Sequence, residues 1–385
     1  MAKIADAFSV IRNGANIKQG LDDSGYPITR IETISNRTVD RNKMGYAGVT
    51  DILKYADYVL QDGDILMSHI NSETHLGKVA LYEKQEDETI IHGMNLLCLR
   101  PKQELLNSRF AFYYLLSEAF LRQIPRITKK SVNQASFNVA ALKELSIPIP
   151  TIEKQIEVVR GLDKVSKLIG LRKEQLTKLD QLVKSRFIEL FGDQEVNPFG
   201  WEQSTIGECC TLKSGTSLSA DVENEGGPIP YVKVGDMNYP GNERYITTSS
   251  RYVSEETAGK GLFGVGSIIF PKRGGAIGTN KKRMTKLPIC ADLNVMGVSS
   301  NGKLLPEYLL AYFDLIDLGA LSDGSSVPQI NNKNIAPLVI CIPPMELQNQ
   351  FAAFLEQTDK SKLAIQQSLD KLELLKKSLM QEYFG

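Results

Sequence analysis

The chain has 385 residues, which is enough for two or three domains. Its 45 Lys and Arg residues balance 45 Asp and Glu residues, which excludes a polybasic protein that coats nucleic acid by charge alone but still allows basic residues on one face. No segment approaches the ~20 apolar residues of a membrane helix. The start of the chain has no secretory core, and the five cysteines form no CxxC pair. A reduced, cytoplasmic protein without membrane contact is expected.

Residues 1–150 predict a globule of mixed α and β structure. Short β-rich runs at 64–67 and 96–99 lie between turn signals such as Gln61-Asp62-Gly63, and a helical stretch follows at 105–123. The word Pro148-Ile149-Pro150 then ends the preceding strand.

Residues 151–190 predict one long helix, because this stretch has no proline and only two glycines, Gly161 and Gly170. Its apolar residues recur mostly at steps of three or four, which is typical of a coiled-coil seam. The seam consists of Ile152, Ile156, Val159, Leu162, Val165, Ile169, Leu176, Leu179, Val183 and Leu190.

Residues 193–385 repeat the whole arrangement. Matching words keep their order while their offset drifts from 203 to 193, as loop insertions and deletions would produce. The alternative is chance resemblance of short apolar words. The matches include Tyr26–Ile31 with Ile229–Val234, Tyr113-Tyr114 with Tyr312-Phe313, Ser131–Gln134 with Ser326–Gln329, and Gln155 with Gln348.

The second copy also ends in a long helix, which begins after Pro343-Pro344. Because neither apolar seam can stay exposed over ~40 residues, each helix needs a partner, and the other helix is the nearest candidate. The order globule, helix, globule, helix predicts an antiparallel pair. The expected fold class is therefore α+β, with two similar mixed α/β globules separated by a two-helix coiled coil of ~60 Å and related by a pseudo-two-fold axis. The alternative is two long core helices inside larger domains. The second seam consists of Leu347, Phe351, Phe354, Ile365, Leu369, Leu372, Leu375 and Leu379.

Four further apolar residues of these helices lie off the two seams. They form either a partner surface or packing of the helix ends on the globules. They are Phe187, Ile188, Leu355 and Leu363.

Recognisable catalytic chemistry is missing. The three histidines, His69, His75 and His92, all lie in the first copy, and a catalytic or metal role duplicated with the fold would not be distributed in this way. Zinc-ligand clusters, the GxSxG elbow, the Walker loop and GxGxxG are absent from the sequence. We expect a binding and scaffolding protein that is not an enzyme and needs no cofactor.

Basic residues cluster in the globules, at 122–130 and at 271–286, and neither stretch contains an acidic residue. Such loops suit contact with backbone phosphates, while polar neighbours such as Asn280 suit the reading of base edges. Globules ~60 Å apart would span about 17 base pairs, which predicts a two-part DNA site with an unread spacer. The alternative is solvated loops with no nucleic-acid partner.

The double arrangement resembles the specificity subunit of type I restriction-modification systems. The short motifs that carry the resemblance occur in the same order as in that family and are distributed over the whole chain. They are Ile147-Pro148-Ile149-Pro150 with Gln155, Ile342-Pro343-Pro344 with Gln348 and Gln350, the closing words Phe191-Gly192 and Phe384-Gly385, and the run Asn197–Trp201.

This resemblance implies two target recognition domains that read the halves of a bipartite site on double-stranded DNA. The helices at 151–192 and 344–385, which follow domains 1–150 and 193–343, would set the spacer. They would also dock two modification subunits, which are adenine-N6 methyltransferases that use S-adenosylmethionine. A restriction subunit with ATP-driven translocation would join the complex. Because Ser68-His69 corresponds to Pro271-Lys272-Arg273, we expect different half-sites and hence an asymmetric target.

The candidate DNA-contacting residues follow from the loops and from the resemblance. Four residues, Gly77, Gly278, Gln134 and Gln329, recur in both copies and are expected to stabilise the fold. The candidates are Arg37, Lys43, His69, Asn71, Lys129 and Lys130 in the first globule, and Lys233, Asn238, Lys272, Arg273, Asn280, Lys281, Lys282 and Arg283 in the second.

Two rival interpretations of the function are a coiled-coil adaptor with two protein-binding globules and an enzyme with its site between the globules.

Overall fold

The protein divides into two compact units in the computed structural model, which describes residues 1–19, 24–131 and 134–385. Unit 1 contains Met1–Arg172 and Ser368–Gly385, and unit 2 contains Lys173–Gln367. Val132 and Asn133 of the repeated word at 131–134 lie outside the described residues. Among the described residues, every helix is too short or too polar to cross a bilayer.

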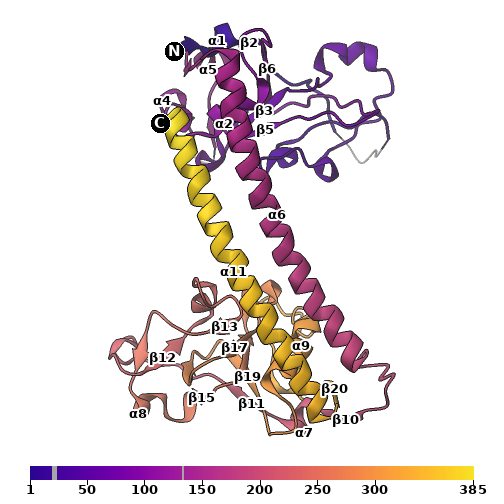
Figure 1. Cartoon of the computed structure of the whole chain (residues 1–385), viewed down its shortest axis with the longest axis vertical. Helices are drawn as coiled ribbons and strands as arrows, with labels where there is room; N and C mark the ends of the chain where they lie inside the picture. Colours follow the sequence, from indigo (N-terminus) through magenta and orange to yellow (C-terminus); the bar gives the residue numbers. More distant parts are fainter. Residues whose placement is uncertain (20–23, 132–133) are drawn as a thin grey trace. The chain divides into compact units, whose positions relative to one another are not determined.

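Two long helices dominate the secondary structure, α6 (Ile152–Phe191) and α11 (Met345–Phe384), each of 40 residues (Figure 1). The division between the units cuts through both helices, so that each unit consists of one globule and a part of each helix. The two long helices expected at 151–190 and 344–385 are therefore confirmed.

Unit 1 is built on an antiparallel sheet in the order β2-β6-β3-β5, with β2 (Phe8–Asn13), β6 (Leu96–Pro101), β3 (Ile65–Ser68) and β5 (Val79–Leu81). A smaller sheet has the order β4-β8-β7, and a two-stranded pair joins β1 to β9. The remaining elements are β4 (Ile70–Asn71), β8 (Ala135–Ser136), β7 (Lys129–Lys130), β1 (Ala2–Lys3), β9 (Ser146–Ile147), α1 (Ile4–Ala7), α2 (Ser108–Leu116), α3 (Glu118–Leu121), α4 (Ile124–Ile127) and α5 (Val139–Lys143), with 3-10 turns at Ile31–Ile34, Arg41–Lys43, Ile52–Tyr58 and Glu73–His75.

Unit 2 repeats this plan with a larger sheet, β11-β19-β16-β17-β13, and a second sheet, β14-β12-β18-β15. Its strands are β11 (Cys210–Ser214), β19 (Val295–Ser300), β16 (Ile268–Pro271), β17 (Arg283–Thr285), β13 (Tyr245–Ile246), β14 (Tyr252–Val253), β12 (Ile229–Val232), β18 (Ile289–Ala291), β15 (Leu262–Phe263), β10 (Glu202–Thr205) and β20 (Val339–Ile342), of which the last two pair with each other. Its short helices are α7 (Ile206–Cys209), α8 (Glu255–Ala258), α9 (Pro306–Leu315) and α10 (Asn332–Ile335), with 3-10 turns at Val222–Asn224, Val234–Asn238, Gly259–Gly261 and Gly274–Thr279.

The internal repeat is confirmed by matching strand neighbours. The order β2-β6-β3 in unit 1 corresponds to β11-β19-β16 in unit 2, and the pair β1·β9 corresponds to β10·β20. Together with the long helices, these globules of mixed strand and helix content confirm the predicted α+β class.

One detail of the predicted alignment is wrong by one residue. The Tyr114 hydroxyl donates to the carbonyl of Ser146 at 2.8 Å, and the Tyr312 hydroxyl donates to the carbonyl of Val339 at 2.8 Å. Tyr312 is therefore the counterpart of Tyr114 and not of Tyr113. The loop after β6 has one residue more than the loop after β19, which shifts the register of the following helix.

Turns and caps explain where the predicted elements begin. Gly63 and Gly266 precede β3 and β16 at φ of +84° and +82°, a backbone conformation that glycine adopts without steric cost. Asn107 caps α2, because its side-chain oxygen accepts hydrogen bonds from the backbone N–H groups of Arg109 and Phe110. The predicted helix 105–123 is shorter than expected, since α2 ends at Leu116 and Ser117 caps a separate turn, α3.

Within each unit the two long helices run in opposite directions. In unit 2, Asp180 of α6 binds Lys362 of α11 at 2.6 Å, and Phe187 contacts Phe351 with ring centroids 5.5 Å apart. As the residue numbers rise along α6, the numbers of the contacting residues on α11 therefore fall, so the two helices are antiparallel in this unit. In unit 1, Tyr383 near the end of α11 lies beside Gly161 near the start of α6.

The predicted apolar seams are only partly correct. Val158 and Phe187 are buried in the globule cores, whereas Ile156 is exposed. Of the four residues placed off the seam, Phe187 and Leu355 are core residues, because the ends of the helices pack on the globules as well as on each other. Ile188 and Leu363 are exposed, at 49% and 61%.

Candidate nucleic-acid interface

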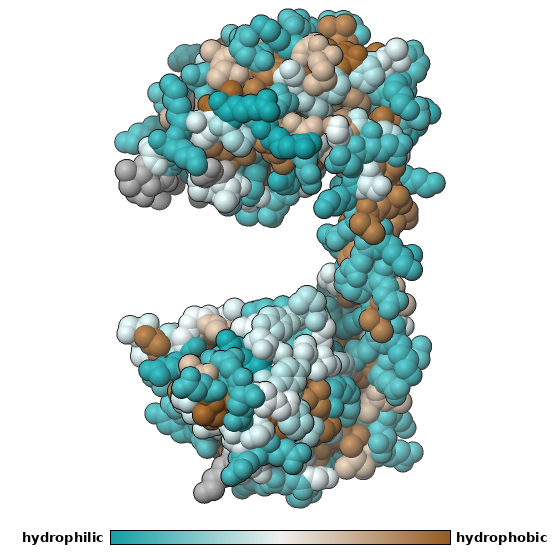
Figure 2. All heavy atoms as spheres, turned by 90° about the vertical axis from the view of Figure 1, so that its left-hand side faces the viewer, coloured by the Kyte–Doolittle hydropathy of each residue, from teal (hydrophilic) through white to brown (hydrophobic). Residues whose placement is uncertain are grey.

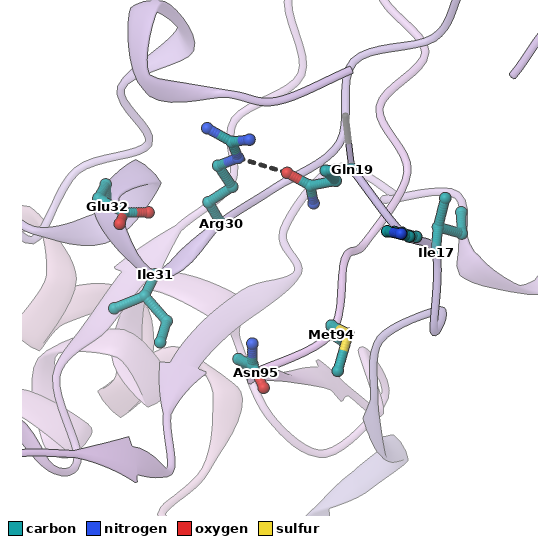
Figure 3. A pocket seen from close by; sticks show the side chains of 8 residues that line it. Ile17, Gln19, Arg30, Ile31, Glu32, Met94 and Asn95 are labelled. Carbon is teal, nitrogen blue, oxygen red and sulfur yellow. Dashed lines mark hydrogen bonds between the residues drawn. The ribbon is translucent and has the colours of Figure 1, made fainter. Parts of the chain in front are cut away.

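A cavity of about 330 Å³, lined by both polar and apolar side chains, opens on the globule of unit 1 (Figure 3). Arg30, an exposed residue, donates a hydrogen bond from Nε to the Gln19 side-chain oxygen at one side of this cavity. Asn95 lies at another side, and its backbone has a left-handed φ of +75°. The cavity thus combines a guanidinium with two carboxamides, the groups that read purine edges in DNA grooves. Its lining residues are Ile17, Lys18, Gln19, Arg30, Ile31, Glu32, Met94 and Asn95.

The chain around Arg30 is held rigidly although the side chain is exposed. Ile28 and Thr29 are buried, and the Arg30 backbone N–H donates to the Thr33 hydroxyl at 2.9 Å. This contact starts the 3-10 turn at Ile31–Ile34. The guanidinium is therefore presented from a fixed backbone.

The equivalent position in unit 2 is Lys233, which also precedes a 3-10 turn and donates its backbone N–H to Asp236. Its ammonium group forms an ion pair with Glu223 at 2.5 Å, and the same carboxylate lies 3.2 Å from Arg251. The ion pair with Lys233 lowers the pKa of Glu223, so this carboxylate stays charged and offsets part of both positive charges. The two copies therefore differ in charge at one equivalent place.

The small sheet of unit 1 brings together three predicted residues. Asn71 on β4 and Lys130 on β7 both pair with Ala135 of the central strand β8, and Lys129 is the neighbour of Lys130. Both lysine side chains are exposed. Residues 58 and 59 positions apart thus present an amide and two ammonium groups on one sheet.

In unit 2 the corresponding chain carries Arg273 and Lys272. The Arg273 side chain is exposed, and its backbone forms an antiparallel bridge with Gln329. Lys272 is half-buried and donates from Nζ to the Ser214 hydroxyl at 2.9 Å. Lys281 donates to the Asn238 side chain, so these two predicted residues are brought together.

Four predicted residues are buried or form hydrogen bonds within the fold. His69 is 6% exposed, and burial lowers its pKa to about 4, which leaves a neutral ring inside the globule. Lys282 is 5% exposed and donates to the carbonyl of Ile316 at 2.6 Å, while burial lowers its pKa to about 8. Both side chains are therefore buried in their globules.

The side chains of the other two residues form hydrogen bonds within the fold. Arg283 donates to the backbone carbonyls of Asn242, Lys282 and Met237. Asn280 adopts a left-handed φ of +53°, and its side-chain oxygen accepts from Lys282 and from the backbone of Leu318. These contacts hold the loop in place, and Asn280 itself is exposed.

Arg37 and Lys43 lie on a separate exposed loop of unit 1. Arg37 has a left-handed φ of +60°, and Lys43 donates to the Ser35 hydroxyl at 3.1 Å. Both remain candidates for phosphate contact.

The cavity residues Arg30, Gln19 and Asn95 were missed from the sequence. Arg30 could have been predicted, because the repeat aligns it with Lys233, which was a candidate DNA-contacting residue. Gln19 had no such signal, since only the folded chain brings it to Arg30.

All five cysteines are free and buried. Across residues 1–19, 24–131 and 134–385, no group of three His, Cys, Asp or Glu residues is placed to hold a metal ion.

Comparison with known proteins gives one consistent result. The model of the type I restriction modification DNA specificity domain matches residues 1–181 and 198–374. A putative type I restriction enzyme MjaX specificity subunit from Methanocaldococcus jannaschii is 31% identical, over 98% of this chain and 91% of its own length. A putative type I restriction enzyme specificity subunit from Haemophilus influenzae, S.HindORF215P, is 22% identical over 87% of each chain.

Solved structures show the same fold. The type I restriction-modification S subunit from M. genitalium matches with a TM-score of 0.57 at 15% identity, over 100% of this chain and 95% of that one. A chain from a study of complex assembly and conformational transition of the type I restriction-modification system matches with a TM-score of 0.57 at 16% identity, over 100% and 96%. At these identities the likeness concerns the fold alone.

Proposed function

Because the chain belongs to the family of type I restriction modification DNA specificity domains, and is a DNA-recognition subunit of such a system, we propose that it binds an asymmetric bipartite DNA site with one half-site per globule. The division into recognition domains 1–150 and 193–343, followed by spacer helices 151–192 and 344–385, is part of this proposal. The subunit itself is proposed to be non-catalytic, cytoplasmic and free of cofactors.

The observation that carries the proposal is the difference between equivalent positions of the two globules. Arg30 has the neutral Gln19 as its partner, whereas its counterpart Lys233 is paired with Glu223. Because the same fold occurs twice in the chain, each globule can bind one half-site. Because the side chains at equivalent positions differ, the two half-sites are expected to differ in base sequence.

The retained residues fall into two classes. Arg30, Gln19 and Asn95 have the chemistry to read base edges, since Arg pairs with guanine and Gln or Asn with adenine. The exposed cations have the chemistry of phosphate contacts, which position the protein without reading sequence. They are Arg37, Lys43, Lys129, Lys130 and Arg273.

The long helices supply a surface for protein partners. Hydrophobic side chains come to the surface among hydrophilic ones along these helices (Figure 2). We propose that this surface docks two adenine-N6 methyltransferase subunits and, through them, a restriction subunit, and that the helices set the spacer. The exposed apolar residues are Leu168, Leu171, Leu374 and Leu375 in unit 1, and Leu182, Ile188 and Leu363 in unit 2.

The test is selection of bound duplexes from a randomised library by the chain in complex with its methyltransferase partner. An asymmetric bipartite motif is expected. Arg30→Ala should relax one base position in one half-site and leave the other half-site unchanged. Arg273→Ala should weaken binding to all sequences about equally.

Two outcomes would contradict the proposal. A palindromic motif would show that both globules read the same sequence. If the complex with the methyltransferase bound no duplex specifically, the alternative would be supported, namely a coiled-coil adaptor with two protein-binding globules.

A further inference from the structure

A segment of unit 2 covers the end of its long helix. Residues 194–201 follow α6, and the Gln194 side-chain oxygen accepts hydrogen bonds from the Tyr308 hydroxyl at 3.0 Å and from the Cys341 backbone N–H at 3.1 Å. The Trp201 indole donates to the carbonyl of Phe191 at 3.2 Å, and Pro198 lies against Gly192. Gln194 is 8% exposed, so this is a sealed contact.

The pseudo-repeat defines the same place in unit 1. Leu305 and Asn107 donate their backbone N–H groups to Gln348 and Gln155, which makes Phe110 the counterpart of Tyr308 three residues later. The strand pairs β1·β9 and β10·β20 make Pro148 the counterpart of Cys341. Phe384 corresponds to Phe191, and each ring packs edge-on against its partner, Phe110 or Tyr308.

In unit 1 this place is a cavity of about 500 Å³. It lies where α6 begins and α11 ends, and its floor contains the buried side chains of Phe110 and Val158. Its lining residues are Met1, Phe110, Pro148, Ile149, Pro150, Lys154, Val158, Glu382 and Tyr383.

The two hydrogen-bond donors that hold Gln194 are both missing from the cavity. Phenylalanine at position 110 has no hydroxyl, and proline at 148 has no backbone N–H. An incoming glutamine would bury its carboxamide without these partners, which costs binding free energy. The cavity is therefore adapted to an apolar side chain at this point.

We propose that this cavity, which we call the helix-end pocket, docks a short segment of a partner protein. By analogy with Pro198, Phe199 and Trp201 in unit 2, the segment carries a proline and aromatic residues, but it has a leucine-like residue where unit 2 has Gln194. Lys154, whose ammonium group pairs with Glu157 at 2.9 Å, and Glu382 add one positive and one negative side chain to the lining.

A second copy of the chain is the less suitable occupant. Its own segment 194–201 is already tied to Tyr308, Cys341 and Phe191, and withdrawal would break these hydrogen bonds. In the helix-end pocket the same Gln194 would find neither donor. A foreign segment has neither disadvantage.

The test uses labelled ten-residue peptides with the sequence of residues 193–202, added to the full chain and followed by fluorescence anisotropy. The peptide with Gln194→Leu should bind roughly tenfold more tightly than the unchanged peptide, because it buries no unpaired amide. A peptide with Pro198, Phe199 and Trp201 all changed to alanine should lose binding.

Protein variants locate the binding to the helix-end pocket. Ile149→Glu and Tyr383→Ala should each weaken the leucine peptide at least tenfold, while Tyr26→Ala, another half-buried tyrosine of unit 1, should not. Phe110→Tyr restores the hydroxyl present in unit 2 and should bring the affinity for the glutamine peptide towards that of the leucine peptide. Thermal melting checks that each variant is folded.

Equal binding of all three peptides, or binding that Ile149→Glu leaves unchanged in a folded protein, would overturn the proposal. A chain that forms dimers which the leucine peptide dissociates would identify a second copy as the occupant and overturn the assignment to a partner.

Discussion

Gln155 on α6 is joined to the chain around Asn107, 48 residues earlier, by a pair of hydrogen bonds. Its side-chain oxygen accepts from the Asn107 backbone N–H at 2.8 Å, and its amide nitrogen donates to the carbonyls of Leu105 and Pro150 at 2.9 Å. Gln348 makes the equivalent contacts with Leu305, Lys303 and Pro343. Each long helix is thus fastened to its globule by a buried glutamine.

Gln155→Leu should lower the free energy of unfolding by about 1–3 kcal/mol, because it leaves buried backbone groups without partners. Gln348→Leu should have a similar effect in unit 2. Urea unfolding measures both. The exposed Gln181→Leu on the same helix is the control and should change the free energy by less than about 0.5 kcal/mol. A neutral Gln155→Leu would show that water replaces the side chain.

These glutamines show how far the sequence could predict the fold. The repeat and the long helices could be read because order and periodicity survive in a single sequence. The role of Gln155 could not, since its partners Asn107 and Leu105 lie about 50 residues earlier and become neighbours only when α2 packs on α6. For the same reason Phe187 was placed off the seam: the pattern of one helix does not reveal that its end packs on a globule.

The candidate site was less predictable than the fold. Composition indicated basic loops, but it could not distinguish the exposed Arg273 from the buried Lys282, since the difference depends on which side of β17 and its loop faces the core. It also could not show that Lys233 meets Glu223, because Glu223 lies in a 3-10 turn before β12 and Lys233 follows β12, and only the folded chain brings them together.

Glu223→Gln should strengthen DNA binding by the complex and make it more sensitive to salt. The substitution removes the carboxylate that Lys233 and Arg251 share, so one more positive charge can contact a phosphate. The slope of log K against log salt should then become steeper by up to about 0.9. Binding measured at several salt concentrations gives the slope. The control is Glu255→Gln, a residue of the short helix α8. An unchanged slope would place the Lys233 region outside the interface.

Arg273→Ala should flatten the salt slope by about 0.9 without loss of stability, because its side chain is exposed. Lys282→Ala should instead change the stability and not the salt slope. Its ammonium group is buried against the carbonyl of Ile316 and the side chain of Asn280, so its removal should lower stability and leave the slope unchanged in the folded fraction. Salt titrations and thermal melting of both variants separate the two roles. A flattened slope for folded Lys282→Ala would return that residue to the interface.

Acid should destabilise unit 1 through its two buried histidines. Burial lowers the pKa of His69 and of His92 from the usual 6.5 to about 4, so the unfolded chain binds more protons than the folded chain between these pH values. The free energy of unfolding should therefore fall as the pH drops from 6.5 to 4, by up to about 3 kcal/mol for each histidine. Above pH 6.5 both states are neutral at these rings, and this contribution is constant.

His69→Leu should remove about half of that pH dependence, because an apolar side chain in the same buried place carries no proton. Urea unfolding at pH 4.5 and at pH 7 measures the difference for each variant. His75→Gln is the matched control, since the His75 ring is exposed and lies within hydrogen-bond distance of the Ser72 and Thr74 hydroxyls. If His69→Leu kept the full acid sensitivity of the parent chain, the ring of His69 would have to be protonated within the fold, and its burial would not set the pH response.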